Sequence, residues 1–155
     1  MSDNSPIRDL VLMAATCLGR AARRTANVVT RAYNQQLSPL GLEVTQFTIL
    51  CTVALEKAQS SAELADLVGV ERSTLARNLD RLIAMGLVSA EKGEGRRIVH
   101  RLTEKGADTV AEAIPLWRKA QDAILARLPD EKAAAIREDF RLLRRAANGA
   151  LAETA

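Results

Sequence analysis

The sequence has few of the residues that build metal sites, disulfide frameworks and aromatic-rich β-sheets. Its 155 residues include one histidine, two cysteines, one tryptophan, one tyrosine and two phenylalanines. One histidine and two cysteines are too few for a zinc cage or a disulfide scaffold. No run of about 18 uncharged apolar residues occurs, so no membrane-spanning helix is expected. The composition therefore predicts a globular protein with no metal, no cofactor and no membrane partner.

The sequence patterns of export and of catalysis are also missing. The first ten residues carry an acid early and lack the basic and then apolar pattern of a signal peptide. We therefore expect a cytoplasmic protein with reduced thiols. We find no glycine-rich nucleotide loop, no histidine-based triad and no paired acids at a strand end, which are usual marks of an active site. The sequence thus indicates a protein that is not an enzyme.

Alanine and arginine are the abundant residues. The chain has 27 alanines, and 17 of its 22 basic residues are arginine. Alanine has the highest helix propensity, whereas strands favour β-branched and aromatic residues, so a mainly α-helical fold is expected. Arginine matches phosphates and guanine edges better than lysine does. The net charge of +3 is too small to identify a nucleic-acid partner by itself.

Both ends of the chain predict long amphipathic helices. Apolar residues recur at helical spacing over residues 7–37, until Ser38-Pro39 interrupts the pattern. A helix of this length spans about 45 Å. A second run covers residues 104–128, where Pro115 should kink the helix, and Pro129-Asp130 is expected to form a turn and a new N-cap. The last helix then carries an apolar stripe of Ile136, Phe140, Leu143, Ala147 and Leu151. Stripes this long exceed what a compact domain covers, so we expect a two-fold dimer to bury them.

Three shorter helices are predicted in the middle of the chain. Thr45 is expected to cap a helix over residues 46–57 that is apolar on nearly every side. Residues 60–63, Ser-Ser-Ala-Glu, indicate a capping box for a short helix that Gly69 ends. A further helix runs over residues 72–85. Its inner stripe is expected to consist of Leu75, Leu79, Leu82 and Ile83.

Two β-rich runs follow, at residues 87–91 and 97–102, on either side of a charged turn with two glycines. A short helix, a turn, a longer helix and a hairpin, in this order, are typical of a winged helix-turn-helix, which we place at residues 45–103. The expected fold is therefore mainly α with a small β-hairpin wing. Residues 7–40 and 104–151 are expected to form a helical dimerisation region.

A helix-turn-helix reads DNA by laying its second helix in the major groove, N-terminal residues first. Arginine pairs with guanine and asparagine with adenine, while serine and threonine at a helix N-terminus donate to phosphates. Arginines at a hairpin tip suit a narrow minor groove. Residues 60–103 carry seven basic and six acidic residues, so affinity must depend on where the arginines point. The candidate DNA-binding residues are Arg72, Ser73, Thr74, Arg77, Asn78 and Arg81 on the helix and Arg96 and Arg97 on the wing.

Five segments in order make the chain resemble the MarR family of transcriptional regulators over about residues 7–151. The wing of that family usually contains Asp-x-Arg, in which the acid braces the arginine. This chain has Glu94-Gly95-Arg96 in that place. The segments that carry the resemblance are TQFTIL at 45–50, SAELA at 61–65, VERSTLARNL at 70–79, residues 82–88, and LTEKG at 102–106.

The resemblance implies a homodimer on a pseudo-palindromic operator. It also implies repression that is released by small phenolic or other anionic ligands, or by thiol oxidation. Ligands of such proteins bind where the dimerisation helices meet the winged domain. From the residues alone, Arg20 and Arg24 share a helix face that can anchor a carboxylate. The candidate ligand-binding residues are Arg20, Arg24, Tyr33, Gln46, Cys51 and Trp117.

Several alternatives stay open. Cys17 is a candidate redox switch, because Arg20 one turn later can lower the pKa of a nearby thiol. A buried cysteine otherwise acts as a small hydrophobic residue. Trp117 can instead fill the core, and the two arginines can belong to an exposed basic face. The chain can also be a winged-helix module that binds DNA or protein without any ligand.

Overall fold

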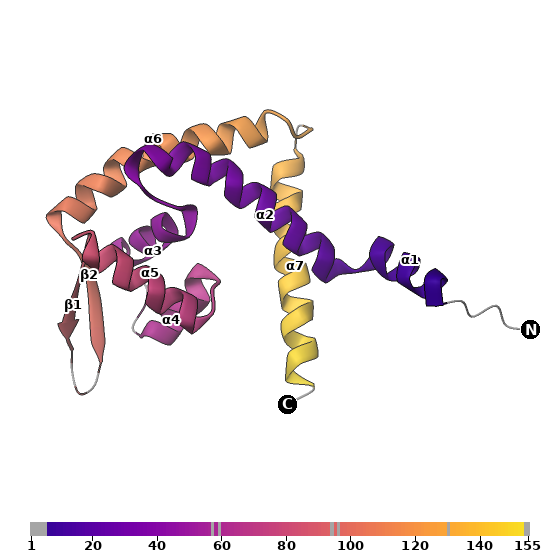
Figure 1. The fold of residues 1–155 in the computed structure, drawn as a ribbon, viewed down its shortest axis with the longest axis horizontal. Coiled ribbons are helices and arrows are strands. Elements are labelled where there is room, and N and C mark those ends of the chain that lie inside the picture. Colours follow the sequence, from indigo (N-terminus) through magenta and orange to yellow (C-terminus); the bar gives the residue numbers. More distant parts are fainter. Residues whose placement is uncertain are drawn as a thin grey trace, which may run out of the picture. The chain divides into compact units, whose positions relative to one another are not determined.

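The computed structural model describes residues 6–153 except 57, 59, 94, 96 and 130 (Figure 1). The described residues form helices and one two-stranded antiparallel sheet, which confirms the expected class of a mainly α fold with a β-hairpin. The elements are α1 (Pro6–Thr16), α2 (Leu18–Leu37), the 3-10 helix η1 (Ser38–Leu40), α3 (Val44–Ala54), α4 (Ser61–Val68), α5 (Arg72–Ala84), β1 (Val88–Lys92), β2 (Ile98–Leu102), α6 (Glu104–Leu125) and α7 (Lys132–Ala152).

The chain divides into two compact units, residues 1–117 and residues 118–155. The first unit contains α1 to α5, the hairpin and the larger part of α6, and the second contains the end of α6 and α7. Among the described residues, no single helix is long and apolar enough to cross a membrane. Two consecutive helical segments, residues 18–40 and 44–54, have the length and composition of a membrane span only when they are taken together, and the chain bends by 75° between them.

The long N-terminal helix is interrupted at Cys17, so the expectation of one continuous helix over residues 7–37 was wrong. Cys17 has a ψ of 107°, which is extended backbone. Its Sγ accepts a hydrogen bond from the backbone N–H of Arg20 at 3.4 Å and so satisfies one of the donors that a helix start leaves unpaired. Cys17 is therefore the exposed N-cap of α2, and it does not lie on a buried apolar stripe.

The core of the first unit is built around α3. Ile49 and Leu50 are fully buried, and Phe47 and Val53 are nearly so, as expected for a helix that is apolar on almost every side. Burying one such side chain contributes about 1.5–3 kcal/mol to stability. The other fully buried large side chains come from α2, α5 and the residue before β1: Leu37, Leu75, Leu82 and Leu87.

The residue that caps α3 is Glu43, so the prediction of Thr45 as the cap was wrong. Glu43 and Gln46 form a capping box, in which the backbone N–H of Glu43 donates to Oε1 of Gln46 at 3.0 Å. The backbone N–H of Val44 donates to Oδ1 of Asn34 at 2.7 Å. This bond ties the end of α2 to the start of α3.

The helix-turn-helix follows the sequence prediction at both ends of α4. The Ser60 hydroxyl accepts a hydrogen bond from the backbone N–H of Glu63 at 3.1 Å. Gly69 ends α4 with a φ of 79°, a left-handed conformation that glycine adopts without strain. Ile83 on α5 is 38% exposed, so its expected place on the inner stripe was wrong. The buried stripe of α5 consists of Leu75, Leu79 and Leu82.

The wing is a hairpin in which β1 and β2 pair from Val88 opposite Leu102 to Lys92 opposite Ile98. The expected hairpin is thus confirmed. It emerges beside the helix-turn-helix, as Figure 1 shows.

The joint between the wing and α6 is packed closely around Thr103. Its Oγ1 donates to the Gly86 carbonyl at 2.7 Å and accepts from the backbone N–H of Gly106 at 2.9 Å, which caps α6. The backbone N–H of Thr103 donates to the Leu87 carbonyl at 3.1 Å. A Cβ on Gly106 would overlap that carbonyl, so a glycine is required there. These contacts explain the Thr and the Gly of the LTEKG segment.

The end of α6 and the start of α7 both differ from the prediction. α6 continues through Pro115 and ends at Leu125, three residues before the expected end. The expected kink at Pro115 stays a prediction. The N-cap of α7 is Glu131, with a φ of 70°. Asp130, the expected cap, lies outside the described residues.

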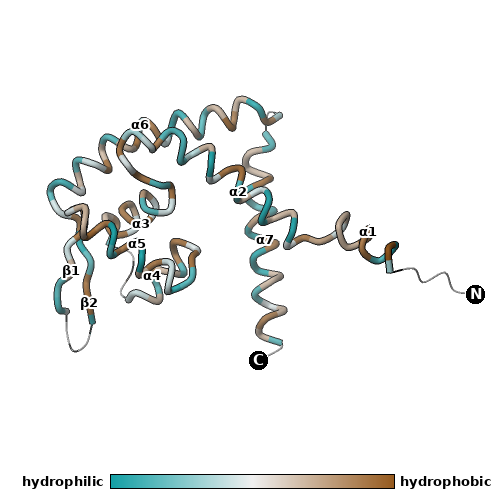
Figure 2. Tube along the Cα trace, in the orientation of Figure 1, coloured by the Kyte–Doolittle hydropathy of each residue, from teal (hydrophilic) through white to brown (hydrophobic). Residues whose placement is uncertain are grey.

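Large apolar side chains are exposed on helices at both ends of the chain. Ile7 and Leu10 on α1 are 70% and 60% exposed, and Phe140 and Leu151 on α7 are 47% and 68% exposed. Hydrophilic and hydrophobic residues alternate along α2 and α7 in Figure 2, as they do in amphipathic helices. Among their described residues, α1 and α7 bury none within the chain.

Candidate nucleic-acid interface

The outer face of α5 is polar. Its leucines point into the core, which directs the residues between them to the opposite side of the helix. Ser73, Arg77 and Arg81 are exposed and four residues apart, while Thr74 and Asn78 beside them are half-buried. The structure thus brings five of the six residues predicted on this helix to one side of it.

Two hydrogen bonds hold side chains on this face. Nη2 of Arg77 donates to Oγ1 of Thr74 at 3.3 Å, and Nδ2 of Asn78 donates to the Thr74 carbonyl at 2.9 Å. The second bond uses one of the four hydrogen-bonding positions of the Asn78 amide. Arg77 and Asn78 are therefore partly oriented before any ligand is bound.

Arg72 lies on a different side of α5. It is five residues before Arg77, which separates the directions of the two side chains by about 140°. Arg72 and Asp80 line a groove between α5 and β2, together with Ile98 and His100 of the wing. Arg72 thus lies beside the wing, on a different side of α5 from the other five predicted residues.

Acidic residues flank the arginines of α5. A hollow of about 450 Å³ at this surface is lined by Glu43, Arg77, Asn78, Asp80 and Arg81. Two of these side chains are negative and two are positive. The charges that line this hollow therefore cancel, and this part of the face is electrostatically mixed.

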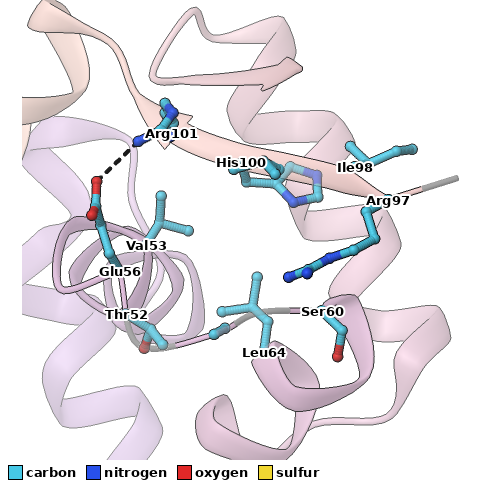
Figure 3. Close-up of a pocket in the computed structure, with 11 residues that line it drawn as sticks. Thr52, Val53, Glu56, Ser60, Leu64, Arg97, Ile98, His100 and Arg101 are labelled. Atoms are coloured by element: carbon cyan, nitrogen blue, oxygen red, sulfur yellow. Dashed lines mark hydrogen bonds and ion pairs between the residues drawn. The ribbon is translucent and has the colours of Figure 1, made fainter. Parts of the chain in front are cut away.

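The tip of the wing is only partly described. Glu94 and Arg96 lie outside the described residues, so the expected bracing of Arg96 by Glu94 has no structural account. Gly95 between them has a φ of 66°. Arg97 lies at the base of the turn and extends beneath the wing toward Leu64 and Ser60 (Figure 3).

The sequence did not predict an ion-pair cluster that joins the wing to the end of α3. Nη1 of Arg101 on β2 lies 3.0 Å from Oε1 of Glu56, which follows α3, and its Nε lies 3.6 Å from Oε2 of Glu91 on β1. Glu56 has a φ of 50°, unusual for a residue with a side chain. Exposed pairs of this kind contribute about 0–1 kcal/mol, so the cluster adds little to the stability of the fold. No local pattern signals a contact between residues 45 positions apart.

Comparison with known proteins places these features in a family. A family model described as a winged helix DNA-binding domain matches residues 42–106. The multiple antibiotic resistance protein MarR of Escherichia coli is 32% identical over 92 residues, which cover 58% of this chain and 64% of that protein, just under two thirds of its length. The HTH-type transcriptional repressor NicR of Pseudomonas putida is 30% identical over 107 residues, 68% of each chain. The solved structure of the M. tuberculosis transcriptional regulator MosR in complex with DNA has a TM-score of 0.78 and 36% identity, and it covers 86% of this chain and 98% of that one. The chain belongs to the MarR family of winged-helix transcriptional regulators.

In this MarR-family chain, the winged-helix match includes α3, α4, α5, the hairpin and the first residues of α6. Every candidate DNA-binding residue falls inside it. The resemblance drawn from the sequence is thereby confirmed at the level of family and fold.

The candidate effector residues of this MarR-family chain are dispersed. Gln46 is 4% exposed, and its amide oxygen is used in the capping box of α3. Trp117 is half-buried against the core. Nη1 of Arg20 donates to the Ala14 carbonyl at 3.0 Å, and Tyr33 lies 13 residues further along, about 20 Å along a helix. Gln46 thus has a structural role in the chain, and effector binding by the set stays a prediction.

The two cysteines differ in environment. Cys51 lies in α3, half-buried, and burial raises the pKa of its thiol, which disfavours the reactive thiolate. Cys17 is exposed at the break between α1 and α2. Of the two, Cys17 is the more accessible to an oxidant.

Proposed function

We propose that this chain is a sequence-specific transcriptional regulator that binds double-stranded DNA through α5 and the wing. The observation that carries the proposal is the exposed row of Ser73, Arg77 and Arg81 on the outer face of α5. These side chains follow the helix for about 12 Å, which is the rise of three to four base pairs. A row of this length suits base reading in the major groove. The similarity to a regulator solved with DNA supports the proposal.

The proposal assigns a DNA contact to each candidate residue. Arg77 and Asn78 read base edges, because arginine and asparagine can each make two bonds to a base. Ser73 and Thr74 donate to phosphates near the positive N-terminus of α5, and Arg81 contacts the backbone one turn on. Arg72, Arg96 and Arg97 contact the DNA beside the wing, where arginines can enter the minor groove.

We infer that the regulator is a homodimer. The apolar side chains exposed on α1 and α7 form surfaces that a monomer leaves in contact with water. A two-fold dimer built from residues 7–40 and 104–151 covers them and presents residues 45–103 twice. Its half-sites would lie about 34 Å apart, one turn of DNA. Sedimentation at micromolar concentration is expected to give a dimer, and a monomer would contradict this assignment.

We further propose that the chain acts as a repressor in the cytoplasm and is released by a small phenolic or anionic effector. NicR, which is similar over 68% of this chain, is named a repressor. Because an effector must lower operator affinity, titrating a bound operator with candidate ligands tests this part of the proposal.

The DNA-binding role is tested by Arg77→Ala, with Arg127→Ala as the matched control. Arg127 is an exposed arginine beyond the end of α6 and outside the winged-helix match. Losing a two-bond base contact costs about 1–3 kcal/mol at each half-site, so a dimer should lose about twice that. Affinity for a duplex selected from a random library should fall for Arg77→Ala and stay unchanged for Arg127→Ala. Equal binding by wild type and Arg77→Ala would show that α5 is not the reading helix.

A further inference from the structure

Thr74 contacts both of the side chains to which base reading is assigned above. It lies three residues before Arg77 and four before Asn78, the two spacings that bring residues together on one face of a helix. Its hydroxyl accepts a hydrogen bond from Nη2 of Arg77 at 3.3 Å, and its carbonyl accepts one from Nδ2 of Asn78 at 2.9 Å. Thr74 therefore holds Arg77 through its side chain and Asn78 through its backbone.

The bond to Thr74 limits which base Asn78 can read. A carbonyl only accepts, so the amide nitrogen of Asn78 must face it. That bond uses one of the two N–H donors of the amide and leaves one donor and the amide oxygen. In the major groove, adenine presents one acceptor and one amino donor, whereas guanine presents two acceptors. The remaining donor and acceptor of Asn78 therefore match adenine and cannot bond twice to guanine.

Arg77 keeps enough donors for a guanine while Thr74 holds it. A guanidinium has five N–H donors, and the bond to the Thr74 hydroxyl uses one of them. Guanine offers two acceptors, O6 and N7. Among the residues that the structure describes, no ion pair engages Arg77, although Glu43 and Asp80 line the same hollow. Arg77 can therefore bind a guanine without leaving an acid or the Thr74 hydroxyl.

The Thr74 hydroxyl can contact a DNA phosphate at the same time. A hydroxyl has one O–H donor and two acceptor positions. The bond from Arg77 occupies one acceptor position, so the O–H stays able to donate to a phosphate oxygen. The phosphate contact assigned to Thr74 above and its hold on Arg77 are therefore compatible.

We propose that Thr74 is the positioning residue of the recognition helix. Its hydroxyl orients Arg77 toward a guanine, and its carbonyl orients Asn78 toward an adenine, so each half-site contains both bases. This inference rests on the proposed DNA binding and adds to it the bases that are read and the residue that sets them.

The hydroxyl of Thr74 should act on base discrimination. An exposed arginine loses mobility when it binds, and ordering one such side chain lowers affinity about two- to tenfold. A held Arg77 has already lost that mobility before the guanine arrives. On a duplex without the guanine, Arg77 makes no base contact, so the hold brings no gain there. The loss of a phosphate contact, in contrast, weakens both duplexes equally and cancels in the ratio of their affinities.

The experiment measures this ratio with the full chain. A duplex is selected from a random library with the wild type, and each base pair is then replaced in turn. The position read by Arg77 is the one at which Arg77→Ala no longer discriminates, and Asn78→Ala identifies the second position in the same way.

The decisive variant is Thr74→Val, which keeps the shape of the side chain and the backbone carbonyl but removes the hydroxyl. Thr74→Ser keeps the hydroxyl and is the rescue variant. The control is Thr109→Val on α6, outside the winged-helix match, where a half-buried threonine hydroxyl donates to the Lys105 carbonyl at 2.8 Å. Circular dichroism establishes that each variant is folded.

We expect Thr74→Val to discriminate about two- to tenfold less than wild type at the Arg77 position. Discrimination at the Asn78 position should stay unchanged, because the carbonyl that holds Asn78 remains. Thr74→Ser and Thr109→Val should behave as wild type. In the Arg77→Ala background, Thr74→Val should cause no further loss of discrimination, since the hydroxyl acts through the missing side chain.

Three results would overturn the inference. Full discrimination by Thr74→Val would show that the hydroxyl does not position Arg77. Equal losses at both positions would show that the substitution disturbs the helix as a whole. A selected base other than guanine at the Arg77 position, or other than adenine at the Asn78 position, would refute the base assignment.

A measurement without DNA separates this inference from the proposed function. Nitrogen-15 relaxation of the Arg77 side chain reports its mobility in the unbound protein. Mobility should be higher in Thr74→Val than in wild type and Thr74→Ser, and equal mobility in all three would refute the hold on Arg77. If wild type bound every duplex alike, the proposed function would fall, and the relaxation data would still decide whether Thr74 holds Arg77.

Discussion

Replacing Gly106 by alanine should destabilise the protein strongly, because the backbone of α6 touches the backbone before the wing at this residue. The added Cβ would overlap the Leu87 carbonyl, and neither backbone is free to move as a flexible side chain would. Overpacking of this kind costs about 1–3 kcal/mol. Shifting α6 would also weaken the three hydrogen bonds around Thr103, each worth about 1 kcal/mol. The expected loss is about 3–5 kcal/mol, a large part of the stability of an ordinary domain.

The same substitution at Gly149 is the control. Gly149 lies within α7, and a Cβ there would meet no atom within 4 Å. Alanine is favoured over glycine in a helix by about 0.5–1 kcal/mol, so Gly149→Ala should leave stability unchanged or raise it. Urea denaturation at one fixed protein concentration measures both variants. If Gly106→Ala lay within about 0.5 kcal/mol of wild type, the close approach of α6 to Leu87 would be refuted.

The remaining predictions concern His100, Cys17 and the recognition helix. Burial lowers the pKa of His100 in the folded chain. Below about pH 6.5, the unfolded chain therefore binds a proton at this residue more readily than the folded chain does. Stability should therefore be full above that pH and decrease below it, and His100→Gln should remove this part of the decrease in denaturation curves at pH 7.5 and 5.5. Exposed Cys17 should react with a thiol reagent before half-buried Cys51, which mass mapping of the labelled chain detects, and faster labelling of Cys51 would contradict the exposure of Cys17 at the break between α1 and α2. Arg77→Ala should lose operator affinity while sedimentation still gives a dimer.

The sequence was sufficient for the parts of the fold that local signals encode. Ser60 and Gly69 mark the ends of α4 because a hydroxyl cap and a left-handed glycine act within one helical turn. The hairpin and the buried leucines of α5 followed from their periodicity. Once the buried leucines of α5 are known, helical geometry places Arg77 and Arg81 on its outer face.

The sequence alone could not predict two kinds of feature: those in which neighbouring residues compete for one role, such as capping a helix, and those that depend on contacts between residues far apart in the chain. A cysteine is a weak cap, so no rule anticipated that Cys17 would interrupt a regular apolar pattern. Glu43 rather than Thr45 caps α3 because Gln46 completes a reciprocal pair with it. The contact of Gly106 with Leu87 and the pair of Arg101 with Glu56 join residues far apart in the sequence. Ile83 matches the inner stripe by spacing and yet is exposed, because only the packed neighbours decide where that stripe ends.

The central claim is that two copies of α5 and the wing read one duplex. The most direct test is the ratio of the affinity for a duplex selected from a random library to the affinity for random duplex, measured at one salt concentration. Specific regulators bind their sites about 10³-fold or more above other DNA, and we predict a ratio in this range with one dimer per selected duplex. A ratio near one at every salt concentration tested would contradict the account.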